Sequence, residues 1–187
     1  PKDALTVKIT GYQWKWKYDY LNEDVSFFSN LSTTQDAIYN RDDKSTDYLL
    51  EVDEPVVIPV GKKVRFLVTA NDVIHSWWVP DLAVKRDAIP GFINEAWTRA
   101  EQTGTYRGQC AELCGKDHGF MPVVVKVVAE EEYHQWGVAK QELAKAEFEL
   151  KNKEWTLEEL MVRGEKTYGT YCAGCHMADG SGLPPAF

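Results

Sequence analysis

The stretch Cys110-Ala-Glu-Leu-Cys114-Gly-Lys-Asp-His118-Gly-Phe-Met121 places two thiols, an imidazole and a thioether within twelve residues. Glu112 lies between the two cysteines and can add its backbone carbonyl. A further imidazole, His75, lies upstream in the strand-like segment Val-Ile-His-Ser-Trp-Trp-Val-Pro. Sulfur ligands combined with imidazole are the donor set that copper prefers, so this stretch predicts a copper site.

Zinc or a disulfide are the alternatives for the same residues. Cys110, Cys114, His118 and His75 could hold a structural zinc ion, but zinc sites do not use a thioether and Met121 lies at ligand spacing. A disulfide between the two cysteines would leave His118 and Met121 without a role. A one-copper blue site needs only one thiolate, whereas two bridging thiolates can hold two coppers, each with one histidine and one weak axial donor.

The twelve-residue segment resembles the CuA loop of the cytochrome c oxidase subunit II family. The resemblance continues upstream through His75-Ser-Trp-Trp-Val-Pro80, Lys85-Arg-Asp-Ala-Ile-Pro-Gly-Phe-Ile-Asn94 and the aromatic segment Gly11-Tyr-Gln-Trp-Lys-Trp-Lys-Tyr-Asp-Tyr20. It spans most of residues 5–128, and the loop motif is highly specific.

The resemblance implies a role for each of these residues. Cys110 and Cys114 would bridge two coppers, with His75 and Met121 serving one copper and His118 and the Glu112 carbonyl serving the other. The Glu112 carboxylate would face a magnesium site shared with oxidase subunit I. Trp14 matches the tryptophan through which cytochrome c delivers its electron.

The implied function is electron entry into a haem-copper terminal oxidase, from cytochrome c or a fused haem c, through copper, to haem a in subunit I. The chain would be an enzyme component only within the oxidase complex and would perform no oxygen chemistry alone. Two alternatives are a CuA domain from a nitrous oxide reductase, which shares the loop, and a zinc-stabilised binding module with no redox role.

A second redox motif, Cys172-Ala-Gly-Cys175-His176, is the attachment signature of c-type haem. A thioredoxin-like dithiol would need a βαβ setting that the segment lacks, and no second cysteine pair is free to complete a zinc site. The flanking residues resemble the start of a bacterial cytochrome c domain. Only 16 residues run from Cys172 to Phe187, and Met177 directly follows His176, so we expect a truncated domain without a packed haem.

Composition restricts the partners and the location of the chain. The 187 residues are 44% hydrophobic and carry a net charge of −8, which argues against nucleic acid and favours either a basic partner or simple solubility of an acidic surface. No apolar run long enough to cross a membrane is present. Because the family carries two transmembrane helices before its globular domain and the chain begins at Pro1, we expect a soluble fragment of a protein anchored on the periplasmic or outer face of the bacterial inner membrane.

The hydrophobic pattern predicts a mainly β fold, a Greek-key cupredoxin sandwich over residues 1–129, with a helical linker over 130–155 and the start of a cytochrome c domain over 156–187. Gly11 is expected to form a bulge, after which Trp14, Trp16, Tyr18 and Tyr20 share one strand face. Residues 21–48 show no clear period and are interpreted as a surface loop or hairpin extension. Helices are expected over 131–152 and, after a capping box at Thr156, over 157–171.

Overall fold

The computed structural model describes residues 4–182. Within this range, the side chain of Cys175 is not described. The chain divides into two compact units, residues 1–144 and 145–187. Within the described residues no helix is both long and apolar enough to cross a membrane.

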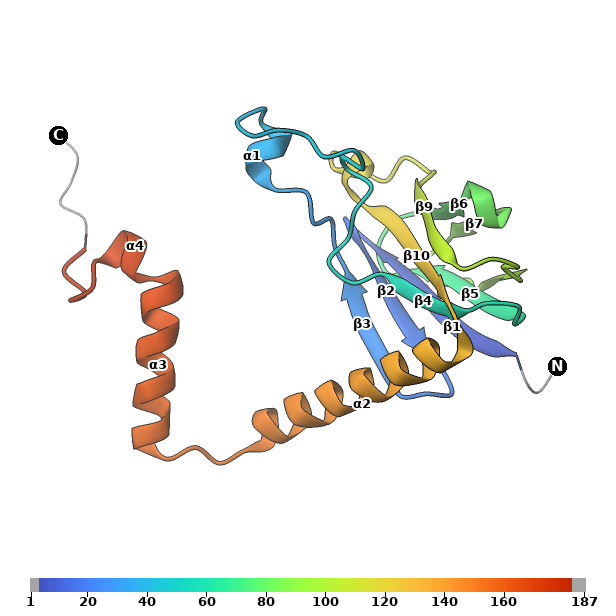
Figure 1. Ribbon diagram of the computed structural model, residues 1–187. Coiled ribbons are helices and arrows are strands. Elements are labelled where there is room, and N and C mark those ends of the chain that lie inside the picture. Colours follow the sequence, from blue (N-terminus) through green and yellow to red (C-terminus); the bar gives the residue numbers. More distant parts are fainter. Residues whose placement is uncertain (1–3, 183–187) are drawn as a thin grey trace. The chain divides into compact units, whose positions relative to one another are not determined.

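Two five-stranded sheets form the first unit, and they face each other as a sandwich (Figure 1). The first sheet has the order β3-β2-β1-β5-β8 and the second the order β4-β10-β9-β6-β7. The strands are β1 (Leu5–Tyr12), β2 (Lys15–Tyr20), β3 (Val25–Ser29), β4 (Val56–Pro59), β5 (Val64–Ala70), β6 (His75–Val79), β7 (Val84–Ala88), β8 (Asn94–Thr98), β9 (Gly104–Cys110) and β10 (Pro122–Val128). This cupredoxin-like sandwich confirms the predicted fold class.

The core lies between the sheets and is made of β-branched and aromatic residues at alternate strand positions. Val64, Phe66 and Val68 of β5 are fully buried, whereas Arg65, Leu67 and Thr69 between them are only partly buried. This period of two follows from the pleat, which points successive side chains to opposite faces. Gly61 lies between β4 and β5, and these two strands belong to different sheets.

Two expectations for the aromatic segment are wrong. Gly11 forms no bulge, because β1 continues in unbroken register, with Gly11 opposite Trp16 of β2 and opposite Ala70 of β5. Trp14 does not share a strand face with Trp16, because Gln13 and Trp14 form the turn between β1 and β2. Glycine also occurs in strands where another group approaches the backbone closely. At Gly11 the approaching group is the imidazole ring of His75.

Residues 21–48 are more ordered than their composition suggests. They contain β3, which pairs antiparallel with β2, and the short helix α1 (Gln35–Ile38), capped by the Thr34 hydroxyl. Of the two alternatives expected for this segment, the hairpin extension is confirmed by the pairing of β3 with β2. The sequence Val25-Ser-Phe-Phe-Ser29 is rich in strand-forming residues, which was the signal available.

The helix α2 (Glu130–Asn152) begins at the end of the sandwich where β2 and β3 are joined (Figure 1). Trp136 packs against Tyr20 with ring centroids 5.0 Å apart, and the Tyr133 hydroxyl donates to Glu23 Oε2 at 2.6 Å. The opposite end of the sandwich carries the loop between β9 and β10, which includes the short helix η2 (His118–Phe120). Another short helix, η1 (Pro80–Leu82), follows β6.

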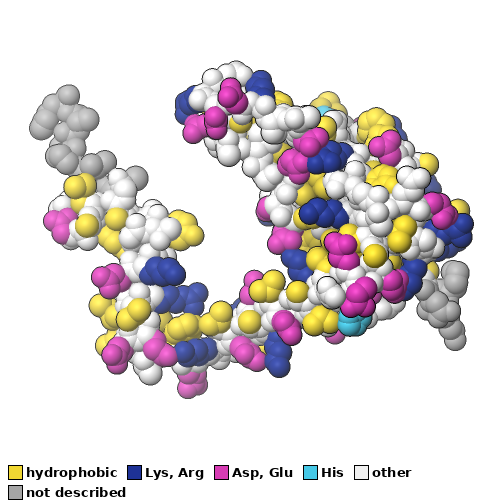
Figure 2. Space-filling view, in the orientation of Figure 1, with side chains coloured by type: hydrophobic (Ala, Val, Ile, Leu, Met, Phe, Trp, Pro, Cys, Tyr) yellow, Lys and Arg dark blue, Asp and Glu magenta, His cyan; other side chains and the backbone are white. Residues whose placement is uncertain are grey.

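The second unit contains α3 (Leu157–Tyr171) and α4 (Ala173–His176). Thr156 and Glu159 form the predicted capping box, and both predicted helices are confirmed within one residue. Hydrophobic side chains are exposed on the surface of α3 (Figure 2), including Leu157 and Met161. The predicted domain boundaries stay predictions, and residues 183–187 of the predicted cytochrome c segment lie outside the described residues.

Candidate metal centre

The two cysteines of the loop lie side by side although their positions depend on different elements. Cys110 ends β9, where it is paired with Trp77 of β6, and Cys114 lies in the loop that follows. Their Sγ atoms are 3.8 Å apart, and both residues are buried, with exposed fractions of 5% and 3%. Two sulfurs at this separation can both contact the same metal ion.

The two histidines approach this sulfur pair through the same ring atom, Nδ1. His75 Nδ1 lies 3.9 Å from Cys110 Sγ, and His118 Nδ1 lies 3.4 Å from Cys114 Sγ. The potential ligand atoms of His75, Cys110 and Cys114 all lie within 4.8 Å of one another. His75 is fully buried and begins β6, so its position is fixed by the sheet, whereas His118 is partly exposed on η2.

The two weaker donors complete the cluster. Met121 Sδ lies 3.5 Å from Cys114 Sγ, and the Glu112 carbonyl lies 3.3 Å from Cys110 Sγ. Met121 is 2% exposed, so its thioether is directed inward. The structure therefore brings together all six residues that the sequence singled out: His75, Cys110, Glu112, Cys114, His118 and Met121.

The thiols differ in acidity because their surroundings differ. Burial raises the pKa of Cys110, but hydrogen bonds with His75 and with the backbone at Ser76 and Glu112 outweigh it and lower the pKa below the ordinary value for a thiol. Burial and the neighbouring charge of Cys110 raise the pKa of Cys114. Of the two thiols, Cys110 is therefore the one that gives up its proton more readily.

A shell of hydrogen bonds around the cluster was not found from the sequence. His75 Nε2 lies 2.8 Å from Asp72 Oδ1, which leaves Nδ1 free to face the sulfurs. Gln13 Nε2 and Trp14 Nε1 both donate to the Cys114 carbonyl, at 2.8 and 3.2 Å, and Trp16 Nε1 donates to the Met121 carbonyl at 3.3 Å. The pair Asn71-Asp72 is typical of a turn, and the position of Asp72 three residues before His75 is the only sequence signal of this contact.

The charge on Asp72 is stabilised by several donors. Burial raises its pKa, but hydrogen bonds from His75 and from the backbone N–H groups of Gln13 and Val73 outweigh burial and lower the pKa below its usual value. A carboxylate that accepts from Nε2 keeps a proton on that nitrogen, so Nδ1 is the ring nitrogen left to offer a lone pair to a metal. Carboxylate–histidine pairs of this kind orient metal ligands.

The donor set fits copper better than zinc. Two thiols, two imidazoles and a thioether are within contact distance of one another, and the thioether has no place in a zinc site. The sandwich and this cluster together define a cupredoxin-like metal-binding domain.

The family model for the periplasmic domain of cytochrome c oxidase subunit II matches residues 5–128. The chain belongs to this family. Curated relatives include probable cytochrome c oxidase subunit 2 of Rickettsia conorii, 46% identical over 144 residues, which are 77% of this chain and 44% of the relative. Cytochrome c oxidase subunit 2 of Cereibacter sphaeroides is 44% identical over 73% of this chain and 49% of the relative. The chain thus spans about half the length of the curated relatives it matches.

Among solved structures, the chain resembles the periplasmic domain of subunit II of cytochrome oxidase from Bradyrhizobium japonicum. The TM-score is 0.67 and the identity 43%, over 76% of this chain and 96% of that chain. A second similar structure, with a TM-score of 0.62 and 42% identity, is a mixed disulfide intermediate between a thioredoxin-like protein and subunit II of cytochrome c oxidase. It covers 76% of this chain and 94% of that chain.

The predicted haem residues lie in the second unit. Cys172 precedes α4 and His176 ends it, with the His176 N–H donating to the Cys172 carbonyl at 2.9 Å. The Tyr168 hydroxyl donates to the Met177 carbonyl at 2.8 Å, which fixes the chain directly after the motif. Cys172 is partly buried, and the side chain of Cys175 lies outside the described part of the chain.

Proposed function

We propose that this chain is the electron-entry module of a haem-copper oxidase and that Cys110, Cys114, His75, His118, Met121 and the Glu112 carbonyl hold two copper ions. The observation that supports it most is the contact between the two buried thiols, each flanked by one Nδ1 atom. The copper pair would supply one-electron transfer, with the charge shared between two metals. Family membership favours the oxidase over a nitrous oxide reductase, and the zinc alternative is distinguished by metal content.

The protein residues would assist electron transfer by holding the centre rigid. His75, Cys110, Cys114 and Met121 are all at most 5% exposed, which excludes water from most of the centre. Hydrogen bonds donated by Gln13 and Trp16 tie the metal loop to the first sheet, and Asp72 accepts a hydrogen bond from His75 of the second sheet. A rigid, largely dry surrounding means that few groups must move when one electron arrives.

Electron entry is proposed at Trp14, from cytochrome c or from a fused c-type haem. The indole is partly exposed at the turn between β1 and β2, and its Nε1 donates directly to the carbonyl of Cys114. A single hydrogen bond therefore links a surface aromatic ring to a bridging cysteine. Trp14 also lines a surface hollow of about 420 Å³ together with Tyr39 and Phe120, which offers room for a partner's side chains.

Electron exit is proposed toward haem a of oxidase subunit I. Large apolar side chains are exposed near the metal loop, where Leu113, Phe92 and Ile74 have exposed fractions of 78, 68 and 46%. Exposed apolar groups mark a contact surface where they adjoin one another. We propose that they meet subunit I, that the full-length protein is membrane-anchored on the periplasmic side, and that oxygen reduction and proton translocation belong to the complex.

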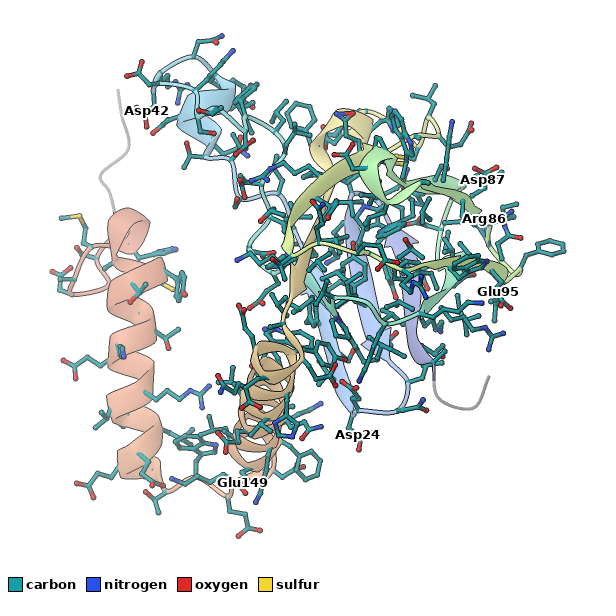
Figure 3. All side chains as sticks on the ribbon, turned by 45° about the vertical axis from the view of Figure 1, so that its right-hand side comes forward. Asp24, Asp42, Arg86, Asp87, Glu95 and Glu149 are labelled. Atoms are coloured by element: carbon teal, nitrogen blue, oxygen red, sulfur yellow. The ribbon has the colours of Figure 1, made fainter. Side chains whose placement is uncertain are left out.

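A magnesium ion is proposed between Glu112 and subunit I. The exposed Glu112 lines a hollow of about 360 Å³ with Asp87 and Asn94. Lys85 and Arg86 also line it, and Figure 3 shows Arg86 and Asp87 at the periphery of the sandwich. Carboxylate oxygens suit magnesium, but so few ligands on one chain require the partner to complete the coordination.

A c-type haem attachment motif is proposed at Cys172 and Cys175, with His176 in the position of the iron ligand. The support is the motif itself and its place at the end of a capped helix. Two thiols and a following imidazole suit attachment to a c-type haem.

The proposed function is tested by adding copper to the reduced protein and mixing it with reduced cytochrome c. We expect two coppers per chain, a purple colour, and bleaching as cytochrome c becomes oxidised. The Cys110→Ser variant serves as control and is expected to lose the shared-electron state. A colourless protein that retains zinc and does not respond to reductant would refute the proposal.

A further inference from the structure

Gly11 lies directly against the imidazole ring of His75. A Cβ atom built on Gly11 would lie 2.8 Å from Cδ2 and 3.0 Å from Cγ of His75, which is closer than side chains tolerate. The backbone of Gly11 is part of the extended strand β1. Glycine is therefore required here for space, and the space is filled by a proposed copper ligand.

The backbone at Gly11 has little freedom to move away from the ring. Gly11 is in register with Trp16 of β2 on one side and with Ala70 of β5 on the other. Its carbonyl also accepts a hydrogen bond from the Asn71 N–H at 3.0 Å. An added methyl group would consequently act on the imidazole rather than on the strand.

The imidazole is enclosed on its other sides as well. His75 is fully buried, its Nε2 is held by Asp72 at 2.8 Å, and Trp16 meets the ring edge-on with centroids 5.9 Å apart. A ring anchored at Nε2 and pushed at Cδ2 must change its tilt. The tilt determines where Nδ1 points, and Nδ1 lies 3.9 Å from Cys110 Sγ.

We propose that Gly11 is a positioning residue for the metal centre: its bare backbone sets the plane of the His75 ring and thereby directs Nδ1 at the site. This inference rests on the proposed role of His75 as a copper ligand. It assigns a function in metal binding to a residue that would otherwise count only as part of a strand. Outer contacts of this kind affect metal affinity by about 10- to 100-fold.

The test compares three Gly→Ala variants of the chain with the unaltered chain. Gly11→Ala introduces the contact with His75. Gly119→Ala is the matched control, because it lies beside His118 and a Cβ there meets nothing within 4 Å. Gly108→Ala reports on folding alone, because a Cβ there would lie 1.8 Å from the Trp78 carbonyl oxygen.

For each variant, copper affinity is measured by competition with a chelator. The electron spin resonance spectrum is recorded for the copper-loaded protein, and the thermal unfolding midpoint is measured for the copper-free form. For Gly11→Ala we expect copper affinity to fall about tenfold and the two coppers to become inequivalent. The unfolding midpoint of its copper-free form should lie much closer to that of the unaltered chain than the midpoint of Gly108→Ala does. Gly119→Ala should match the unaltered chain.

An unchanged spectrum and affinity in Gly11→Ala would overturn the inference, and so would a copper-free form as destabilised as Gly108→Ala, because Gly11 would then be needed only for folding. If the unaltered chain itself showed no shared copper signal, the proposed function would fail instead.

Discussion

Asp72 holds His75 by the ring nitrogen that faces away from the sulfurs, with 2.8 Å between Oδ1 and Nε2. The same carboxylate accepts from the Gln13 N–H at 2.8 Å, so it joins the turn between β1 and β2 to the start of β6. Because the imidazole is oriented by this pair, the proposed metal site depends on a residue that is not itself a proposed ligand.

Asp72→Asn should weaken copper binding about tenfold, since the amide no longer fixes the ring with a charge. Copper affinity is measured by competition with a chelator. Asp117→Asn, on the metal loop with an ion pair to Lys116 at 4.0 Å, is the control and should bind as the unaltered chain does. Equal affinities for both variants would contradict the role of Asp72.

Trp14→Phe should slow electron uptake from reduced cytochrome c by at least about tenfold, or ~1.4 kcal/mol in activation free energy, because the hydrogen bond to the Cys114 carbonyl is lost. The copper spectrum should stay nearly unchanged. Rapid mixing measures the rate. Trp97→Phe, at an indole that is 60% exposed and carries Lys63 above its ring, should leave the rate unaltered. A similar loss in both variants would argue against entry at Trp14.

Alkaline pH should unfold the domain through buried phenols. Burial raises the pKa of Tyr18, Tyr20 and Tyr133, and the bond to Glu23 raises that of Tyr133 further. The folded state then retains protons that the unfolded chain loses above its ordinary pKa of about 10, so stability falls as pH rises beyond that value. Tyrosinate absorbance should show three of the nine tyrosines ionising only together with loss of circular dichroism.

Tyr133→Phe tests the contact between α2 and the sandwich. Loss of the hydrogen bond to the Glu23 carboxylate should lower the free energy of unfolding at neutral pH by about 1–2 kcal/mol. Denaturant titration measures it. Tyr171→Phe, at a side chain that is 81% exposed, should leave the free energy of unfolding unchanged.

For the alkaline-pH prediction, ionisation of all nine tyrosines in the folded protein would show that the phenols of Tyr18, Tyr20 and Tyr133 are not buried in solution.

The copper-free domain should remain folded. Bringing His75 and Cys110 together closes a loop of 35 positions, which costs about 3 kcal/mol beyond a constant. The pairing of Trp77 with Cys110 between β6 and β9 closes that loop without metal. Circular dichroism of the chelated protein should show cooperative thermal unfolding, and a signal typical of an unfolded chain would contradict this.

The residues that meet at the candidate site could be predicted from the sequence better than the contacts that surround them. Cys110, Cys114, His118 and Met121 lie within twelve residues, so their chemistry is visible as spacing, and alternation such as Val64, Phe66 and Val68 reveals the strands. Asp72 lies three residues before His75 in the sequence, but the contacts of Gly11 and Gln13 with the site arise only when β1, β6 and the metal loop meet at one end of the sandwich. No local pattern carries that information, and for the same reason Gly11 was interpreted as a bulge.

The number and kind of metal ions bound at Cys110 and Cys114 test the account most directly. Metal analysis of the reconstituted chain, combined with electron spin resonance, should find two coppers per chain with one unpaired electron divided equally between them. One zinc ion per chain, or a single copper whose electron stays on one nucleus, would contradict it.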